Sequence, residues 1–365
     1  MDVPHLAPGS PTVQAETERG AGLSPGPSGG EPPWRAERSA QNGTERELIE
    51  VRLTVHPQYH GWRLDRFIKA RIPRLSRNRI QQMIRAQRQL QGLWLRPASR
   101  VQANHEVCLL RPAPDEPDVP RHFTVLFSDG QLAAIDKPAG LPVHATARFH
   151  KNTLTALLRE RFGEPVPMLG HRLDRETSGL LLLGLDRPTT AALKALFRER
   201  RVQKRYLAMV HGRPSLAQGV IDLPLGRDTA SGIRVKMGVV PGGHPSRTHY
   251  RVLETCATMH GELSLVEAFP ETGRQHQIRA HLHAVGLPVV GDKLYGPDPA
   301  LFLEFIETGW TESLRRRLLL PRQALHAADA IFPHPMSGEP LHLTCPLPPD
   351  LAAFWKNART NGALP

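Results

Sequence analysis

The chain has 365 residues, and its 47 lysines and arginines against 35 acidic residues give a formal net charge of +12 at pH 7. This length accommodates two domains and a flexible segment. The positive charge favours a polyanionic partner, either nucleic acid or an anionic membrane surface. The membrane is the weaker alternative, because no apolar run approaches the roughly 20 residues of a spanning helix and the sequence begins without the features of a signal peptide.

Residues 1–47 are rich in proline, glycine, serine and glutamate, so they bury too little apolar surface to order and are predicted to be disordered. Apolar residues then recur at helical spacing from Leu64 until Pro73 ends the pattern. Ser76 is the expected N-cap of a second helix, whose apolar face carries Ile80 and Ile84.

This two-helix region is strongly basic. Between positions 63 and 100 the sequence has eleven lysines and arginines, and its only acidic residue is Asp65. A solvated helix face usually mixes charges of both signs, because like charges one turn apart repel. We therefore expect a nucleic-acid contact here, with a plain solvated face as the alternative. The candidate RNA-binding residues are Arg63, Arg66, Arg77 and Arg79.

A proline-rich linker is predicted at residues 112–120, because proline fixes the backbone and removes hydrogen-bond donors. The larger domain is expected at residues 121–357, followed by a tail at residues 358–365. Its helices and strands interleave without a βαβ period, which predicts an α+β domain with a mixed, largely antiparallel sheet. Helices are expected at 153–161, 188–200, 276–285 and 300–308. Strands are expected at 124–127, 132–135, 180–183, 205–210, 248–253, 263–268 and 341–344.

The most informative segment of the larger domain runs from Gly170 to Gly179, with the sequence GHRLDRETSG, and a strand-length run of leucines follows it. Asp174 lies here among His171, Arg172 and Arg175. A carboxylate surrounded by cations keeps a low pKa and is available as a nucleophile at neutral pH. The alternative is an aspartate that only caps a turn and pairs with Arg172.

This segment resembles the signature of the RluA-type RNA pseudouridine synthases, in which the aspartate attacks the target nucleoside. Four further segments resemble the same family in the same order: LAAIDKPAGLPVH at 132–144, VQKRYLA at 202–208, ETGRQHQIRAH at 271–281, and GDKLYG at 291–296 with the C-terminal residues 322–340. One departure is Gln275, where the family usually has threonine or serine. The last segments resemble the closing strand pair and turn of the fold, and we assign them no chemistry.

The resemblance implies roles for individual residues. Asp174 is the implied nucleophile or anionic stabiliser and Arg279 its ion-pair partner. Tyr206 would stack on the extruded base and accept a proton. Arg172 would occupy the gap left by that base or bind phosphate, while Lys137 and Arg274 would contact the RNA.

The basic region resembles an S4-type RNA-binding domain, which implies a small S4-like α/β domain at residues 48–111 in front of the catalytic domain. It departs from the usual hairpin of that domain at residues 89–95. RNA contacts of that loop are therefore not predicted.

The implied reaction moves uracil from an N1 to a C5 linkage on C1′ of its ribose, which requires no cofactor and no metal. His276, His281 and His283 do not share one helix face, and no acidic cluster accompanies them, so no metal site is expected. The three cysteines form no CxxC pair and favour a reduced, cytoplasmic protein: Cys108, Cys256 and Cys345.

The favoured substrate is large-subunit ribosomal RNA and the alternative is transfer RNA, and we expect a monomer. A non-catalytic RNA-binding or ribosome-assembly factor is a second alternative. A nucleoside or glycoside hydrolase is a third, which would need a second carboxylate near Asp174. Glu176 is the only near candidate for it in the sequence.

Overall fold

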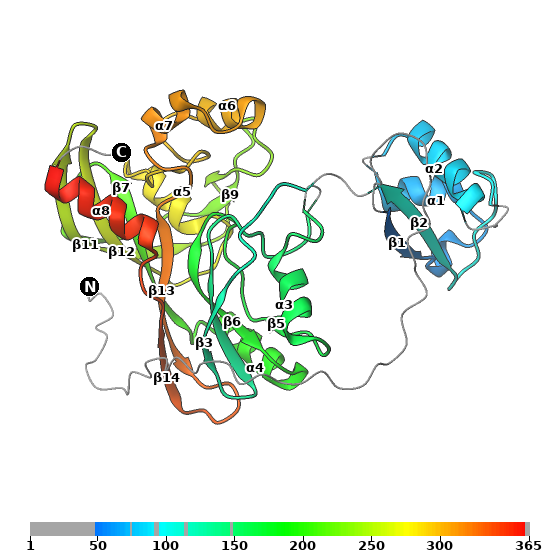
Figure 1. Ribbon diagram of the computed structural model, residues 1–365, viewed down its shortest axis with the longest axis horizontal. Coiled ribbons are helices and arrows are strands. Elements are labelled where there is room, and N and C mark those ends of the chain that lie inside the picture. The colour runs from blue at the N-terminus through cyan, green and yellow to red at the C-terminus, as the bar shows by residue number, and fades with distance from the viewer. Residues whose placement is uncertain (1–47, 74, 91–94, 113–115, 147–148, 362–365) are drawn as a thin grey trace. The chain divides into compact units, whose positions relative to one another are not determined.

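The computed structural model describes residues 48–73, 75–90, 95–112, 116–146 and 149–361 (Figure 1). The predicted disorder of residues 1–47 concerns a segment outside these described residues. By its internal contacts the chain divides into two compact units, with the boundary between Glu116 and Pro117. This boundary lies inside the predicted linker. Because the carbonyl of Pro117 accepts a hydrogen bond from the amide of Asn152 at 3.0 Å, the second part of that linker packs on the larger unit.

The smaller unit packs two helices against a two-stranded sheet. Its strands β1 (Leu48–Thr54) and β2 (Glu106–Pro112) are antiparallel. Between them lie a 3-10 turn η1 (Pro57–Tyr59), α1 (Leu64–Arg71) and α2 (Arg77–Leu90). The helix α1 ends before Pro73, and Ser76 Oγ accepts a hydrogen bond from the N–H of Arg79 at 3.2 Å, as expected of an N-cap. Buried apolar residues from both helices and β2 form one core: Phe67, Ile68, Ile80, Ile84, Val107 and Leu109.

The larger unit is built on a mixed sheet whose ten strands are described by the structure. In spatial order they are β3 (Thr124–Ser128), β4 (Leu132–Lys137), β6 (Ser178–Gly184), β13 (Leu325–Pro333), β7 (Gln203–His211), β12 (Gly261–Pro270), β11 (Arg247–Thr258) and β8 (Gln218–Asp222), with β14 (Pro340–Thr344) on β13 and β5 (Met168–Leu169) on β6. Only the β6–β13 pair is parallel among these pairings. A separate small hairpin joins β9 (Leu225–Arg227) to β10 (Met237–Val239). The predicted α+β fold with a largely antiparallel sheet is confirmed.

The helices that accompany this sheet are α3 (Leu154–Phe162), α4 (Arg187–Arg198), α5 (Gln277–Ala284), α6 (Ala300–Thr308), α7 (Glu312–Leu318) and α8 (Pro349–Asn361). A capping side chain sets the start of α3, α4 and α7. Thr153 caps α3 by accepting the N–H of Ala156, and Asp186 caps α4 by accepting the N–H of Thr189. In the described part of the chain, no helix has both the length and the apolar character to cross a membrane.

The predicted elements of the larger unit omit β5, β8, β9, β10, β13, α7 and α8, although the family resemblance implies a closing strand pair near β13. The helix α8 continues to Asn361 and buries Ala358, so the predicted end of the domain at residue 357 is too early. This helix packs along β11, as Figure 1 also shows. Arg322 fixes its start, since the guanidinium donates two hydrogen bonds to Asp350 at 2.7 and 2.9 Å and a third to Ser178 at the start of β6.

The larger unit has two main apolar cores. One surrounds β4, β6, α3 and α4, and the other surrounds β7, β12, α5 and α8. Tyr206 on β7 packs against both cores. Gly179 permits the parallel contact between β6 and β13, because a Cβ at this position would lie 2.3 Å from the carbonyl oxygen of Ala327. Its φ of +110° also favours glycine.

Candidate active site

Asp174 lies on the loop that connects β5 to β6. Backbone contacts fix this loop, because the carbonyl of Arg175 accepts the N–H of Gly140 at 2.8 Å and the carbonyl of Asp174 accepts the N–H of Thr177 at 3.2 Å. Thr177 itself is buried and bonded to the side chain of Gln323. These contacts hold the C-terminal part of the loop, and Asp174 lines a cavity.

Lys137 holds this loop through hydrogen bonds to backbone carbonyls. Its side chain is completely buried, and its ammonium donates hydrogen bonds to the carbonyls of Pro138, Leu141 and Arg175 at 2.7, 2.9 and 3.1 Å. Burial lowers the pKa of Lys137 to about 7. The prediction that Lys137 contacts RNA is therefore wrong, since a side chain with no exposed surface and three backbone acceptors holds the loop instead.

The cation that faces Asp174 is Arg279, from the first turn of α5. Arg279 Nη1 donates to Asp174 Oδ2 at 2.8 Å, and the same guanidinium donates two hydrogen bonds to Asp292, at 2.6 and 2.9 Å. Asp292 is completely buried and also accepts the backbone N–H groups of Leu294 and Tyr295 at 3.0 Å. The two hydrogen bonds to Asp292 fix the orientation of the guanidinium, so its remaining N–H group points to Asp174 in a fixed direction.

The charge balance keeps Asp174 ionised. Burial alone raises the pKa of Asp174, but the Arg279 guanidinium outweighs it and holds this pKa below its usual value. Two carboxylates likewise raise the pKa of Arg279, although burial opposes them. Asp174 therefore enters the cavity as an anion at neutral pH.

The ring of cations expected next to Asp174 in the sequence is not what the structure shows. His171 Nε2 accepts the N–H of Leu182 at 3.1 Å and its ring stacks on Phe197, and burial lowers its pKa to about 3, so the ring is neutral. Arg175 pairs with Glu176 at 2.9 Å. The compensating charge comes from Arg279, 105 positions along the chain.

Tyr206 lines the same cavity from β7. Burial, together with the negative charge of Asp174, raises the pKa of Tyr206. Its phenol therefore keeps its proton at neutral pH. This favours Tyr206 as a stacking surface and hydrogen-bond donor in the unliganded site, rather than as the proton acceptor suggested by the sequence.

His276 also lines the cavity, and the buried Tyr295 packs against His276 and Arg279. His276 occupies the left-handed region at φ +57°, where it precedes α5, and its Nε2 lies 3.9 Å from Asp174 Oδ1. Its Nδ1 lies 3.0 Å from the hydroxyl of Tyr295, which accepts the N–H of Met237. Burial lowers the pKa of His276 to about 4, so it is neutral. The guanidinium of Arg279 stacks 4.9 Å above the Tyr295 ring.

Asp292 and Tyr295 come from a segment to which the sequence analysis assigned no chemistry. Its only signal was the acidic and aromatic pair in GDKLYG, which is equally typical of a structural turn. The structure instead makes this segment the support of the arginine that contacts Asp174.

The cavity at Asp174 has a volume of about 160 Å³. Exposed Arg172 and Arg274 line it, together with Asp174, Tyr206, His276 and Arg279. The structure thus brings together the predicted catalytic residues and two of the predicted RNA contacts. Two exposed guanidinium groups lining the same cavity as an ionised carboxylate suit the binding of an RNA phosphate next to the cavity.

The candidate RNA-binding residues of the smaller unit have different environments. Arg63 and Arg77 both bond to the buried Asp65, yet their side chains stay 40% and 61% exposed. Arg66 lies 4.6 Å above the ring of Trp62, and Arg79 is exposed. All four remain accessible to an anionic partner.

The three histidines near α5 have protein partners. His281 lies between Thr248 Oγ1 and the carbonyl of Leu223, at 2.9 and 3.0 Å, and His283 packs edge-on against Tyr295. Within the described ranges of residues 48–361, no group of three histidine, cysteine or acidic side chains is placed to hold a metal ion.

Comparison with known proteins agrees with this geometry. Residues 131–284 match the family described as RNA pseudouridylate synthase. The chain is 36% identical over 322 residues to the ribosomal large subunit pseudouridine synthase D of Zymomonas mobilis, across 83% of this chain and 96% of that protein. A relative with the same name from Nitrosomonas europaea is 36% identical over 338 residues, across 88% and 91% of the two chains.

A solved structure titled human RNA pseudouridylate synthase domain containing 1 matches with a TM-score of 0.52 and 28% identity, over 65% of this chain and 89% of that one. The extent of these matches, together with the cavity built around Asp174, shows that this chain belongs to the RNA pseudouridine synthases, isomerases that act on RNA.

Proposed function

We propose that this enzyme is an RluA-type synthase that isomerises specific uridines in structured large-subunit ribosomal RNA, as a cytoplasmic monomer. The observation that carries the catalytic assignment is the ion pair between Asp174 and Arg279 in a cavity that Tyr206 also lines. The ribosomal substrate is supported by the relatives named ribosomal large subunit pseudouridine synthase D.

In the proposed mechanism the target uridine is extruded from the RNA so that C1′ reaches Asp174. The C1′–N1 bond breaks, the detached uracil rotates, and a C1′–C5 bond forms while the C5 proton is lost and N1 gains a proton. Attack on C1′, addition to C6 and a glycal route all start from an ionised carboxylate. Arg279 keeps Asp174 ionised, because its positive charge lowers the pKa of the carboxyl group.

The other residues of the cavity have positioning roles in this proposal. Tyr206 stacks on the extruded base, and Arg172 fills the gap that the base leaves or binds phosphate. Arg274 contacts the RNA backbone from the turn before α5. Stacking against an aromatic ring is a common way to hold a base outside its helix.

The smaller unit is proposed to be an S4-like RNA-binding domain. Its support is the excess of basic residues between positions 63 and 100 and the exposure of Arg66 and Arg79. Each phosphate that such residues neutralise releases counterions, which gives affinity without sequence readout.

The test of this function is to map pseudouridine in cellular RNA with and without the gene, and after return of the wild-type gene or of Asp174→Asn. We expect one or more large-subunit sites to disappear and only the wild-type gene to restore them. If pseudouridine disappears only from transfer RNA, the substrate is transfer RNA and not ribosomal RNA. Release of free uracil from RNA would indicate a hydrolase.

A further inference from the structure

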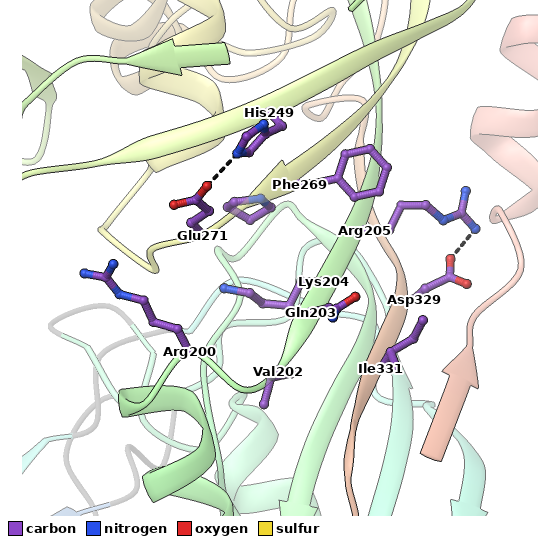
Figure 2. Close-up of a pocket in the computed structure, with 11 residues that line it drawn as sticks. Arg200, Val202, Gln203, Lys204, Arg205, His249, Phe269, Glu271, Asp329 and Ile331 are labelled. Carbon is purple, nitrogen blue, oxygen red and sulfur yellow. Dashed lines mark hydrogen bonds and ion pairs between the residues drawn. The ribbon is translucent and has the colours of Figure 1, made fainter. Parts of the chain in front are cut away.

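A second cavity adjoins the catalytic cavity at the start of β7 (Figure 2). Its volume is about 280 Å³, and it lies between the first residues of β7, the end of β12 and the middle of β13. Lys204 and Pro270 line both cavities. The two cavities therefore share part of their walls.

The acidic side chains of the second cavity already have partners. Glu271 pairs with His249 at 2.5 Å, and Asp329 pairs with Arg205 and, at 2.9 Å, with His342. Figure 2 shows Arg205 turned to Asp329, while Lys204 and Arg200 extend to the side of the Glu271–His249 pair. Neither Lys204 nor Arg200 has a carboxylate within ion-pair distance among the residues that the structure describes.

The ammonium of Lys204 is therefore an uncompensated charge within the described part of the chain. The residue is half-buried, and burial lowers the pKa of Lys204 to about 8. A cation removed from water without a counterion destabilises the fold. Such a group at the wall of a cavity is expected where an anionic ligand supplies the missing partner.

The remaining wall is apolar. Val202, Phe269, Pro270 and Ile331 line it, and Figure 2 shows Phe269 on the side of β7 where Arg205 lies. Single-stranded RNA is bound by the combination of a base-packing surface and a basic group for the phosphate. The volume is close to the lower end of small-ligand pockets, roughly 300 Å³, and so suits one nucleotide rather than several.

We propose that this second cavity is a subsite for a nucleotide that flanks the target uridine. Its base packs against Pro270, and its phosphate is bound by Lys204 and by Arg200 at the rim. The proposal rests on RNA being the substrate, but not on which RNA carries the target.

The test measures kcat and KM on a stem–loop that contains a uridine modified by the wild-type enzyme, from whichever RNA the mapping identifies. Lys204→Met is expected to raise KM roughly tenfold or more, the loss of one charge-assisted hydrogen bond, with kcat changed by less than about threefold. Lys204→Arg keeps the charge and is expected to stay within about threefold of wild type. Lys356→Met, the same substitution at an exposed position on α8, is the matched control and should change neither constant.

A second arm places one uncharged methylphosphonate linkage at a time on either side of the target uridine. At one of the two positions the wild-type enzyme should lose about as much in KM as Lys204→Met does, and the variant should lose nothing more. Additive losses at both positions, or an unchanged KM for Lys204→Met, would overturn the subsite.

Thermal melting separates binding from folding. Because the Lys204 ammonium has no ion-pair partner among the described residues of the unliganded protein, Lys204→Met should melt at or above the wild-type temperature. A variant that melts several degrees lower and loses kcat and KM together would show that Lys204 has a structural role, and would also overturn the proposal.

Discussion

Two aspartates in this chain pair with arginines, but they differ in how many of their carboxylate oxygens are occupied and in how exposed they are. In the smaller unit, Asp65 Oδ1 accepts a hydrogen bond from Arg63 at 3.1 Å, and Oδ2 accepts hydrogen bonds from Arg63, Arg77 and Gln81 at 3.0–3.3 Å. Asp174 is in the larger unit, and of its two carboxylate oxygens only Oδ2 accepts a hydrogen bond from a described side chain, that of Arg279. Asp174 is 22% exposed in a cavity, whereas the side chain of Asp65 has no exposed surface.

The comparison separates a structural carboxylate from a reactive one. Both have a lowered pKa, so ionisation alone does not distinguish them. Asp65 has no oxygen left for another atom, and its hydrogen bonds tie α1 to α2. Asp174 keeps one oxygen free, with the neutral His276 at 3.9 Å, and the arginine that orients it is itself held by Asp292.

Arg279→Ala should have the largest effect, because it leaves two carboxylates without their cation. Removing one partner of a buried ion pair costs about 3–5 kcal/mol. We expect a large loss of stability and the loss of measurable pseudouridine formation, checked by denaturant unfolding and by a turnover assay. Burial then raises the pKa of Asp174, so any residual activity should require a higher pH than wild type, as a pH–rate profile would show.

A milder replacement tests the same pair. Arg279→Lys keeps the charge but loses the two-pronged interaction with Asp292. Compared with Arg279→Ala, we expect Arg279→Lys to recover more of the wild-type stability than of the wild-type activity. Wild-type melting and wild-type turnover by Arg279→Ala would show that the pair with Asp174 has no role.

Asp65→Asn should lower stability without ending turnover. The amide replaces a charged acceptor of several hydrogen bonds, at a cost of about 1–3 kcal/mol. Hydrogen exchange should therefore speed up at the amides of α1 and α2 and stay unchanged in the larger unit. Loss of activity on a short stem–loop that keeps wild-type binding would contradict the structural role of Asp65.

Tyr206→Phe should have a smaller effect on turnover than either change at Arg279. The phenyl ring keeps the stacking surface and loses only a hydroxyl whose raised pKa keeps it protonated. We expect kcat to fall by less than about 100-fold, the lower end of what a proton-transfer group contributes. Tyr206→Ala, which removes the ring, should lose more. Equal losses for Phe and Ala would show that the hydroxyl, rather than the ring, carries the role.

Replacing Arg66 and Arg79 by glutamine should give the smallest effect, on RNA affinity alone. Removing one arginine that binds a phosphate lowers the slope of log K against log salt by roughly one. The double variant should therefore bind RNA with a shallower salt dependence and an unchanged kcat. Arg213→Gln, at an exposed arginine beyond the end of β7 that pairs with Glu262, is the control. An unchanged slope in the double variant would remove the smaller unit from the proposed RNA-binding surface.

Sequence patterns were sufficient where they concern local structure. Pro73 correctly placed the end of α1, and Ser76 placed the start of α2. Seven of the ten strands that the structure describes in the large sheet were also predicted, among them β7, β11 and β12. The strand β13 was missed because it is buried along nearly its whole length and includes alanines, a histidine and an aspartate, which lack the alternation of a half-buried strand.

The site was less predictable because burial decides the charge of its groups. From the sequence, Lys137 and His171 are expected to be available cations. In the structure, the Lys137 ammonium donates to backbone carbonyls, and the His171 ring is neutral. The pairing of Asp174 with Arg279 came from family resemblance, and nothing in the local sequence shows that Asp292 supports it. The contact between Asp174 and Arg279 joins segments 105 positions apart, so it depends on the fold of the sheet.

The most direct measurement is pseudouridine formation by Asp174→Asn under single-turnover conditions, with enzyme in excess over bound RNA. The substitution keeps the volume and removes only the charge. We predict RNA affinity within a few-fold of wild type and no pseudouridine above background, while Asp65→Asn converts its RNA at close to the wild-type rate. Conversion by Asp174→Asn at more than about one hundredth of the wild-type rate, a deficit below the range of essential nucleophiles, would contradict the assignment of Asp174 as the reactive carboxylate.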